Sequence, residues 1–157
     1  MTIKLLAIGK TDSKALSQLI SEYEKRLVHY IKFELEIIAD IKNSKNLSEP
    51  QQKEKEGELI LKKLNPTDVL VVLDENGKQF TSEAFSEYLQ KKMNAGIKQL
   101  VIAIGGPYGF SETVYSRAQG KISLSKMTFS HQMVRLFATE QIYRAFTILR
   151  NEPYHHR

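Results

Sequence analysis

Three short aliphatic runs, separated by longer amphipathic segments, most constrain what this chain can fold into. They occupy residues 3–8, 68–73 and 100–104, and the last two consist almost entirely of valine, leucine, isoleucine and alanine. A strand that is apolar on both faces is typical of the interior of a parallel sheet. Because helical patterns lie between these runs, we expect an α/β protein.

The remaining segments complete an alternating order of strands and helices. Asp12 or Ser13 can cap a helix that extends to about Tyr30, and Ser130 can cap a final helix that reaches about Leu149. Between them the pattern predicts strands at 33–38 and 122–124, helices at 51–64, 82–94 and 111–117, a loop at 43–50 and a turn at 74–77. We therefore expect a single domain over residues 1–157, with a mostly parallel sheet and helices on both faces.

Composition excludes several classes of protein. The 157-residue chain is 41% hydrophobic, enough for a proper core, and it contains no cysteine, which excludes disulfide scaffolds, thiol nucleophiles and Cys-ligated metal sites. Its His, Asp and Glu residues do not have metal-ligand spacing, so we expect no metal. The chain shows neither a secretory signal nor a run of about 20 apolar residues, so we expect a cytoplasmic protein without a membrane span.

The positive charge is concentrated near the C-terminus. The net charge is +5, and residues 113–157 contain seven Lys and Arg side chains against only two acids, Glu140 and Glu152. This part of the chain therefore carries the whole excess. A basic excess gathered at one end indicates an anionic partner, with nucleic acid first.

The final helix has apolar residues on more than one face. One stripe comprises Val134, Ala138, Ile142, Ala145 and Leu149, and another comprises Met133, Leu136, Phe137, Tyr143 and Phe146. Two apolar faces indicate burial against the sheet and against something else. A second copy of the chain would provide that cover; the alternative is a central helix covered by its own domain.

Three loops are expected to meet where a ligand would bind, because open α/β sheets bind ligands beyond the carboxyl ends of their strands. They are residues 73–77, 104–109 and 124–129. The glycines of the second loop let backbone approach a ligand, although the spacing is neither a Rossmann fingerprint nor a P-loop. Asp74 and Glu75 are candidate acid–base or ribose-binding residues, or ordinary turn residues. The apolar third loop suits a flat ligand such as adenine, or packs against the domain itself.

The C-terminal tail is the most unusual segment. Residues 153–157 read Pro-Tyr-His-His-Arg, which places an aromatic ring, two imidazoles and a guanidinium side by side. Such a tail can stack on a base, hold a phosphate and exchange a proton near neutral pH. The alternative is a frayed terminus or the remnant of a tag.

An ordered set of motifs connects the chain to a known family. The motifs are Leu73-Asp74-x-x-Gly77-Lys78, Ile104-Gly105-Gly106-Pro107-x-Gly109, Leu124-Ser125-x-Met127-Thr128-Phe129-x-His131, Val134-Arg135, Glu140-Gln141-x-Tyr143-Arg144-Ala145 and Pro153-Tyr154-His155. With this set the full chain closely resembles the pseudouridine-N3 rRNA methyltransferases of the SPOUT superfamily. The resemblance implies a single SPOUT-type domain with a C-terminal trefoil knot at about residues 100–150 and a functional tail at 151–157.

The resemblance also implies a cofactor, a substrate and an assembly. The cofactor would be S-adenosyl-L-methionine, and its binding residues would be Leu73, Gly105, Leu124, Ser125, Lys126, Met127, Thr128 and Phe129. The substrate would be a pseudouridine in a stem-loop of 23S rRNA, methylated at N3 on the assembled ribosome. The enzyme would be a homodimer with the knot regions in its interface.

Catalytic roles are expected for three C-terminal residues. N3 must lose a proton on attack, so a general base or a group that stabilises the developing anion would help. His155 is our candidate base, Tyr154 would stack on or orient the pseudouridine, and Arg144 would steady its carbonyls or a phosphate. For Arg144 the alternative is a structural salt bridge with Glu140.

RNA contacts are expected from Arg135, His156 and Arg157, with a structural salt bridge as the alternative for Arg135. The tail departs from the family pattern, because family tails have a basic residue directly after Tyr-His, where His156 stands here, and Arg157 comes one position later. The competing hypotheses are a noncatalytic RNA- or ribosome-binding module with the same fold, and a nucleotide- or phosphate-binding regulator.

Overall fold

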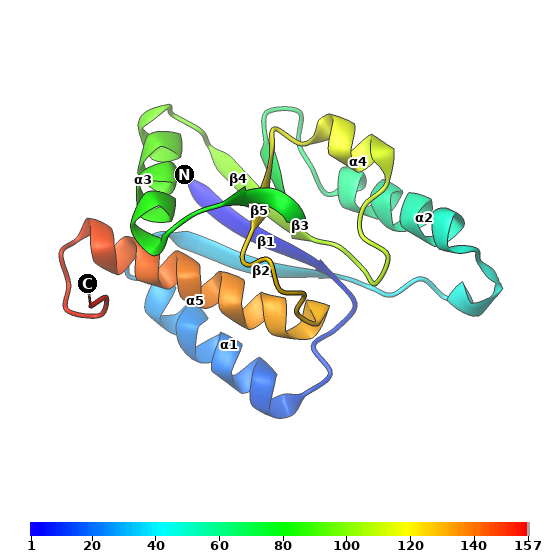
Figure 1. The fold of residues 1–157 in the computed structure, drawn as a ribbon, viewed down its shortest axis with the longest axis horizontal. Coiled ribbons are helices and arrows are strands. Elements are labelled where there is room, and N and C mark those ends of the chain that lie inside the picture. Colours follow the sequence, from blue (N-terminus) through cyan, green and yellow to red (C-terminus); the bar gives the residue numbers. More distant parts are fainter. Residues whose placement is uncertain (157) are drawn as a thin grey trace.

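The computed structural model describes residues 1–156 and shows five strands and five α-helices in alternating order (Figure 1). The elements are β1 (Thr2–Ile8), α1 (Lys14–Leu27), β2 (Lys32–Ile38), the 3₁₀ turn η1 (Ser44–Asn46), α2 (Glu49–Lys62), β3 (Val69–Gln79), α3 (Ser82–Asn94), β4 (Gln99–Ile104), α4 (Glu112–Arg117), β5 (Gly120–Ser123) and α5 (His131–Leu149). The α/β prediction is confirmed, and α3 has the bounds that the sequence predicted.

All five strands are parallel and follow the spatial order β2-β1-β4-β3-β5. The three aliphatic runs form the three inner strands, as predicted. Leu5 in β1, Leu70 in β3 and Leu100 in β4 are each 0% exposed, which is why these strands lack the apolar–polar alternation of a half-exposed strand.

Helices cover both faces of the sheet. On one face α1, α3 and α5 pack over a core that includes Leu27, Leu89 and Ile142. On the other face α2 and α4 pack through Ile60 and Val114. Figure 1 shows α5 lying between α1 and α3 along the first face. Among residues 1–156 no helix has the length and apolarity needed to cross a membrane.

The segment predicted as a turn at 74–77 is instead part of β3. The strand continues to Gln79, and its pairing with β5 shifts register so that Leu73 and Lys78 both lie opposite Ile122. A Cβ at Gly77 would lie 2.6 Å from the carbonyl carbon of Ile122. The turn-forming residues therefore make an irregularity between two paired strands, with Gly77 giving the backbones room to approach.

Helix boundaries also differ from the prediction by a few residues. α2 begins at Glu49 because Ser48 and Gln51 form a capping box and Pro50 is accepted in the first turn, so the predicted loop at 43–50 is shorter. α1 ends at Leu27 rather than Tyr30.

α5 is partly covered by its own domain. Ile142, Ala145 and Phe146 are buried, whereas Met133 and Phe137 are each 38% exposed. The N-terminal half of the helix thus keeps an uncovered apolar side. The trefoil knot stays a prediction.

Candidate functional site

A cleft of about 730 Å³ lies beside the middle of β3, at its register shift, and beyond the carboxyl ends of β4 and β5. The three loops expected to converge do meet here. Its lining includes seven of the eight predicted cofactor-binding residues, namely Leu73, Gly105, Leu124, Ser125, Met127, Thr128 and Phe129. The eighth, Lys126, has an exposed side chain that is not part of the lining.

Neighbouring atoms leave little room for side chains at two glycines of the loop after β4. A Cβ at Gly105 would lie 3.2 Å from Cζ of Phe110, and one at Gly106 would lie 2.4 Å from Oε2 of Glu56. Gly109 has a φ of +79°, which favours glycine. A backbone bridge between Gly106 and Gly109 closes the loop. The cleft wall is therefore bare backbone at this point.

The loop after β5 is held by its own hydrogen bonds. Ser123 Oγ donates to the carbonyl of Ser125 at 2.8 Å, and the Met127 N–H donates to Ser125 Oγ at 3.0 Å. Thr128 Oγ1 donates to Glu75 Oε2 at 3.1 Å, across the cleft mouth. These bonds fix the backbone of the loop, in which the side chain of Met127 is 73% exposed.

Asp74 is a structural carboxylate in this arrangement. It accepts hydrogen bonds from the Tyr115 hydroxyl and from the Asn76 N–H. Burial opposes ionisation of Asp74, but these bonds and the nearby Lys121 outweigh it and lower its pKa. Burial and the bond to Asp74 raise the pKa of Tyr115 to about 12. Asp74 is thus a poor proton acceptor at neutral pH, and no sequence spacing signalled its partner Tyr115.

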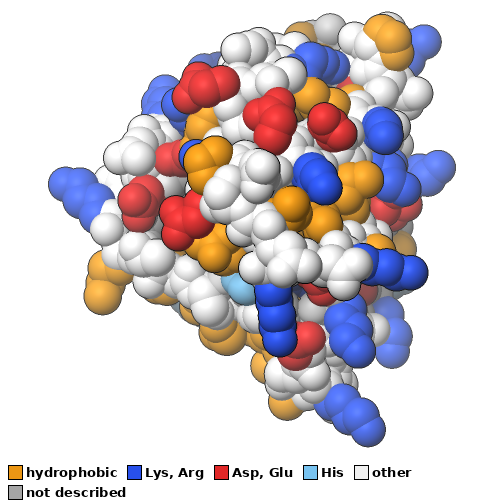
Figure 2. All heavy atoms as spheres, turned by 90° about the vertical axis from the view of Figure 1, so that its right-hand side faces the viewer, with side chains coloured by type: hydrophobic (Ala, Val, Ile, Leu, Met, Phe, Trp, Pro, Cys, Tyr) orange, Lys and Arg blue, Asp and Glu red, His pale blue; other side chains and the backbone are white. Residues whose placement is uncertain are grey.

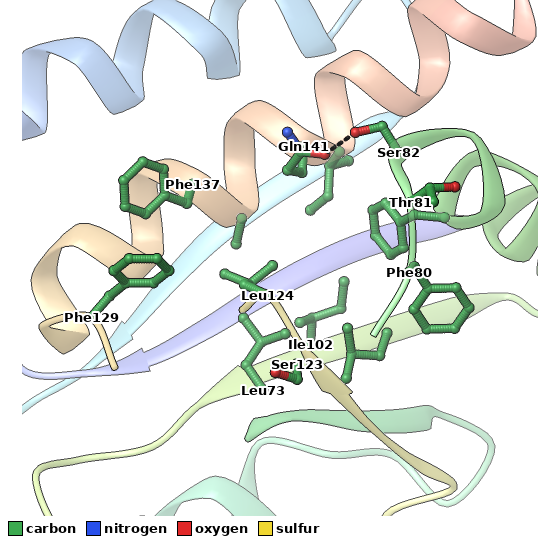
Figure 3. A pocket seen from close by; sticks show the side chains of 14 residues that line it. Leu73, Phe80, Thr81, Ser82, Ile102, Ser123, Leu124, Phe129, Phe137 and Gln141 are labelled. Atoms are coloured by element: carbon green, nitrogen blue, oxygen red, sulfur yellow. Dashed lines mark hydrogen bonds between the residues drawn. The ribbon is translucent and has the colours of Figure 1, made fainter. Parts of the chain in front are cut away.

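A smaller apolar cavity of about 330 Å³ adjoins the cleft (Figure 3). It shares Leu73, Ser123, Leu124 and Phe129 with the cleft lining and extends between β3, the start of α3 and the middle of α5. Ser82 Oγ donates to Gln141 Oε1 at 2.9 Å on its rim. The cavity continues the apolar surface that begins at the exposed side of α5.

The charges on this side of the molecule are mixed. Figure 2 shows the right-hand side of Figure 1, the side to which the start of α2 extends, with acidic and basic side chains interspersed around apolar ones. This face therefore carries charges of both signs rather than one continuous basic patch.

Arg135 lies in the protein interior rather than on an RNA-facing surface. Its side chain is 0% exposed. It donates to the carbonyls of Gly9 at 2.6 Å and Ile8 at 2.8 Å, and to Thr11 Oγ1 at 3.2 Å. The RNA contact expected of Arg135 stays a prediction, and it would require the guanidinium to leave this buried position. Arg135 is a structural residue, held by carbonyls rather than by a salt bridge.

The predicted catalytic residues form one cluster on α5. Arg144 pairs with Glu140 at 2.6 Å, as the structural alternative proposed. The Arg144 guanidinium also lies 4.7 Å from the Tyr154 ring centre and 3.3 Å from Nδ1 of His155. Tyr154 donates its hydroxyl to Glu140 Oε1 at 2.9 Å. The tail thus folds back onto the helix.

Both ring nitrogens of His155 lie close to a charged side chain. A guanidinium can only donate, so Nδ1 of His155 must accept from Arg144, and a neutral ring then carries its proton on Nε2. Nε2 lies 3.6 Å from Glu83 Oε1. The hydrogen bond to Glu140 raises the pKa of Arg144, and burial together with the hydroxyl contact to Tyr23 raises that of Tyr154.

The tail cluster and the cleft lie at different points along α5. His131 lines the cleft at the start of the helix. Glu140 and Arg144 follow about 14 and 20 Å further along its axis, at about 1.5 Å per residue. His156 is exposed, and Arg157 lies outside the described residues.

Comparison with known proteins matches the chain along its whole length. A family described as predicted SPOUT methyltransferase matches residues 1–155. The chain is 74% identical to the ribosomal RNA large subunit methyltransferase H of Flavobacterium johnsoniae over 100% of both chains. The proteins of the same name from Parabacteroides distasonis and Bacteroides thetaiotaomicron are 67% and 56% identical, over 99% of each chain.

Proposed function

This chain belongs to the SPOUT methyltransferase family, and from that premise we propose that it methylates N3 of a pseudouridine in a stem-loop of 23S rRNA, on the assembled ribosome, with S-adenosylmethionine as the methyl donor. The observation that carries the proposal is the convergence of 73–77, 104–109 and 124–129 on one cleft, in a chain whose full-length relatives are named rRNA methyltransferases. Those names favour catalysis over a noncatalytic RNA-binding module.

The cleft residues suit S-adenosylmethionine. The side chains of Leu73, Leu124, Met127 and Phe129 offer apolar surface to a flat, uncharged adenine, and the bare backbone at Gly105 and Gly106 permits close approach with N–H and C=O groups. When bound there, the cofactor would supply a methyl group already activated by a positively charged sulfur.

The tail residues supply the means to handle the pseudouridine. Arg144, kept cationic by Glu140, would stabilise negative charge that develops on the base carbonyls. Tyr154 stays protonated and would donate a hydrogen bond or stack. For His155 to accept the N3 proton, the Arg144 contact to Nδ1 must first be released, so the described arrangement is a resting one.

We infer that the active enzyme is a homodimer in which one chain's tail reaches the other chain's cleft. Within one chain the tail cluster is bound beside Glu140 and Arg144, away from the cleft at the start of α5. Exposed apolar side chains surround the cleft mouth, among them Met127, Phe129, Met133 and Phe137. A second copy packed on them would cover this surface and bring the two halves of the site together.

Calorimetric titration with S-adenosylmethionine tests the cofactor assignment, and we expect saturable binding. Absence of binding at millimolar cofactor would reject the methyltransferase mechanism.

The substrate assignment is tested by mass spectrometry of 23S rRNA from a deletion strain, which should lack one methylpseudouridine. An unchanged methylpseudouridine level would show that the substrate is another nucleotide.

A further inference from the structure

A buried carboxylate lies directly behind the glycine loop of the cleft. Glu56, in α2, is 4% exposed. A Cβ built at Gly106 would lie 2.4 Å from its Oε2 and 2.7 Å from its Oε1, and Gly106 itself lines the cleft. A single layer of backbone therefore separates the Glu56 carboxylate from the cleft.

The position of this carboxylate is fixed by its neighbours. Gly57 lets α2 approach the start of α4 so closely that a Cβ there would lie 2.4 Å from Ser111 Oγ. Gln52 Nε2 donates to Glu56 Oε1 at 3.0 Å from one turn earlier in α2. The side chain is thus held against the loop rather than free to turn toward water.

The second oxygen of Glu56 is unsatisfied. Within residues 1–156, Oε2 is the one buried side-chain oxygen or nitrogen without a hydrogen-bond partner, and no Lys or Arg of that part of the chain forms a salt bridge with it. Burial, helped by the nearby Asp40, raises the pKa of Glu56. The hydrogen bond from Gln52 and the nearby His131 oppose this shift without cancelling it. An unpaired buried carboxylate costs free energy, and a positive charge in the cleft would offset that cost.

We propose that Glu56 makes the cleft favour S-adenosylmethionine over S-adenosylhomocysteine, the product left after methyl transfer. This inference rests on the proposed function. The two molecules differ by a methyl group and by the positive charge on sulfur. Most cleft contacts treat them alike, whereas a buried carboxylate behind one backbone layer acts on the charge through a medium that screens far less than water. Loss of that charge on methyl transfer then weakens binding and helps the product to leave.

The other carboxylates at the cleft are less suited to this role. Asp74 already accepts hydrogen bonds from Tyr115 and from the backbone of Asn76. Glu75 is exposed, so water and salt screen its charge. Glu56 alone combines burial, a vacant acceptor and contact with the loop.

The test uses calorimetry at pH 8 to measure how tightly the wild type, Glu56→Gln and Glu58→Gln bind S-adenosylmethionine and S-adenosylhomocysteine. For Glu56→Gln, which keeps the shape and removes the charge, we expect affinity for S-adenosylmethionine to fall about tenfold, with affinity for S-adenosylhomocysteine changed less than about twofold. Glu58→Gln, an exposed neighbour in the same helix, is the matched control and should leave both affinities unchanged. Sinefungin carries a protonated amine in place of the sulfonium, so its affinity should fall in Glu56→Gln as that of S-adenosylmethionine does.

Stability of the free protein provides a readout that is independent of activity. Removal of an unpaired buried charge should leave the urea midpoint unchanged or raised, and Glu56→Met provides a second, apolar replacement with the same expected loss of preference. Equal weakening of both ligands would overturn the proposal, because it would mean that Glu56 merely supports the loop. An unchanged ratio of affinities in both variants would overturn it too. If the wild-type protein bound neither ligand, the proposed function itself would fail.

Discussion

Arg135 joins the last helix to the end of the first strand. Its guanidinium donates hydrogen bonds to the carbonyls of Ile8 and Gly9 at the carboxyl end of β1. Burial lowers the pKa of Arg135, and the nearby Asp12 and Asp40 oppose that shift. These hydrogen bonds tie the N-terminal part of α5 to the end of β1, next to the cleft-lining residues His131 and Val134.

Replacement of Arg135 by alanine should therefore destabilise the protein strongly. Loss of the guanidinium leaves buried carbonyls unsatisfied and opens a cavity, and we expect a loss of about 3–5 kcal/mol in the free energy of unfolding. Urea denaturation measures it, with the exposed Lys25→Ala as control, expected within about 0.5 kcal/mol of wild type. Unchanged stability together with weakened rRNA binding would restore the RNA-contact interpretation.

Glu36 makes a pH-dependent link between the edge strand and its neighbours. Its carboxylate lies 2.7 Å from both Lys4 and Lys63, and hydrogen bonds from these two lysines lower its pKa below the ordinary 4.5. A lowered pKa means that the contribution to stability is present above about pH 4.5 and is lost as the pH falls through the folded-state value.

The variant Glu36→Gln should accordingly lose about 1 kcal/mol of stability at pH 7. The difference from wild type should shrink as the pH drops below 4.5, because the wild-type carboxyl then becomes neutral as well. Urea denaturation at a series of pH values measures this, with the exposed Glu58→Gln as a control for general charge effects. A difference that stays constant down to pH 3 would show that the ion pairs contribute nothing.

Elements with a strong local pattern were predicted well. The inner strands β1, β3 and β4 and the helix α3 follow from apolar runs, spacing and caps that act within a few residues. The turn predicted at 74–77 is not formed, because pairing with β5, more than 40 residues away, overrides local turn propensity. The burial of Arg135 could not be predicted for the same reason, because its partners Ile8 and Gly9 are distant in sequence.

The candidate site likewise has features that the sequence could predict and features that it could not. The cleft lining could be anticipated from topology, since carboxyl ends of parallel strands meet at one edge. Tyr115 and Glu56 could not, because each acts through a contact between helices and loops that no spacing encodes. A functional role for the tail stays a prediction, and its docking on Glu140 and Arg144 is visible only in three dimensions.

The tail is the element whose removal should separate binding from catalysis. A chain that ends at Pro153 retains every residue of the cleft lining, so we expect it to bind S-adenosylmethionine within about twofold of wild type but to lose methyl transfer by at least about 10²-fold, a typical contribution of a general base. Calorimetry and methylation of purified ribosomes measure the two properties. Full activity in this variant would mean that residues 154–157 are a dispensable terminus.

The proposed homodimer can be tested by measuring the mass of the protein in solution. Light scattering should give a mass of twice the 18.0 kDa chain. Phe137→Lys places a charge on the exposed apolar side of α5, so it should shift the protein toward monomer and reduce methyl transfer. Glu87→Lys, on an exposed position of α3, is the control and should remain dimeric. A wild-type protein that is monomeric at micromolar concentration would contradict the homodimer.

Complementation tests whether the site is shared between chains. A tail-truncated chain and a Gly106→Leu chain, whose cleft wall clashes with Glu56, should each be inactive alone. Mixed dimers should recover activity, because one chain then provides the cleft and the other provides the tail. If mixing restored nothing although heterodimers form, cleft and tail would have to act within one chain.

The order of the strands has a consequence for synthesis. β1 is translated first, yet its inner neighbour is β4, with Thr2 opposite Gln99. At roughly 5–20 residues per second, β1 waits about 5 to 20 s for that partner. During this interval β2 can pair with one side only, and the other side of a strand built from aliphatic residues stays open. The nascent chain thus passes through a stage with an unprotected strand edge, when a chaperone that holds it would most improve its yield.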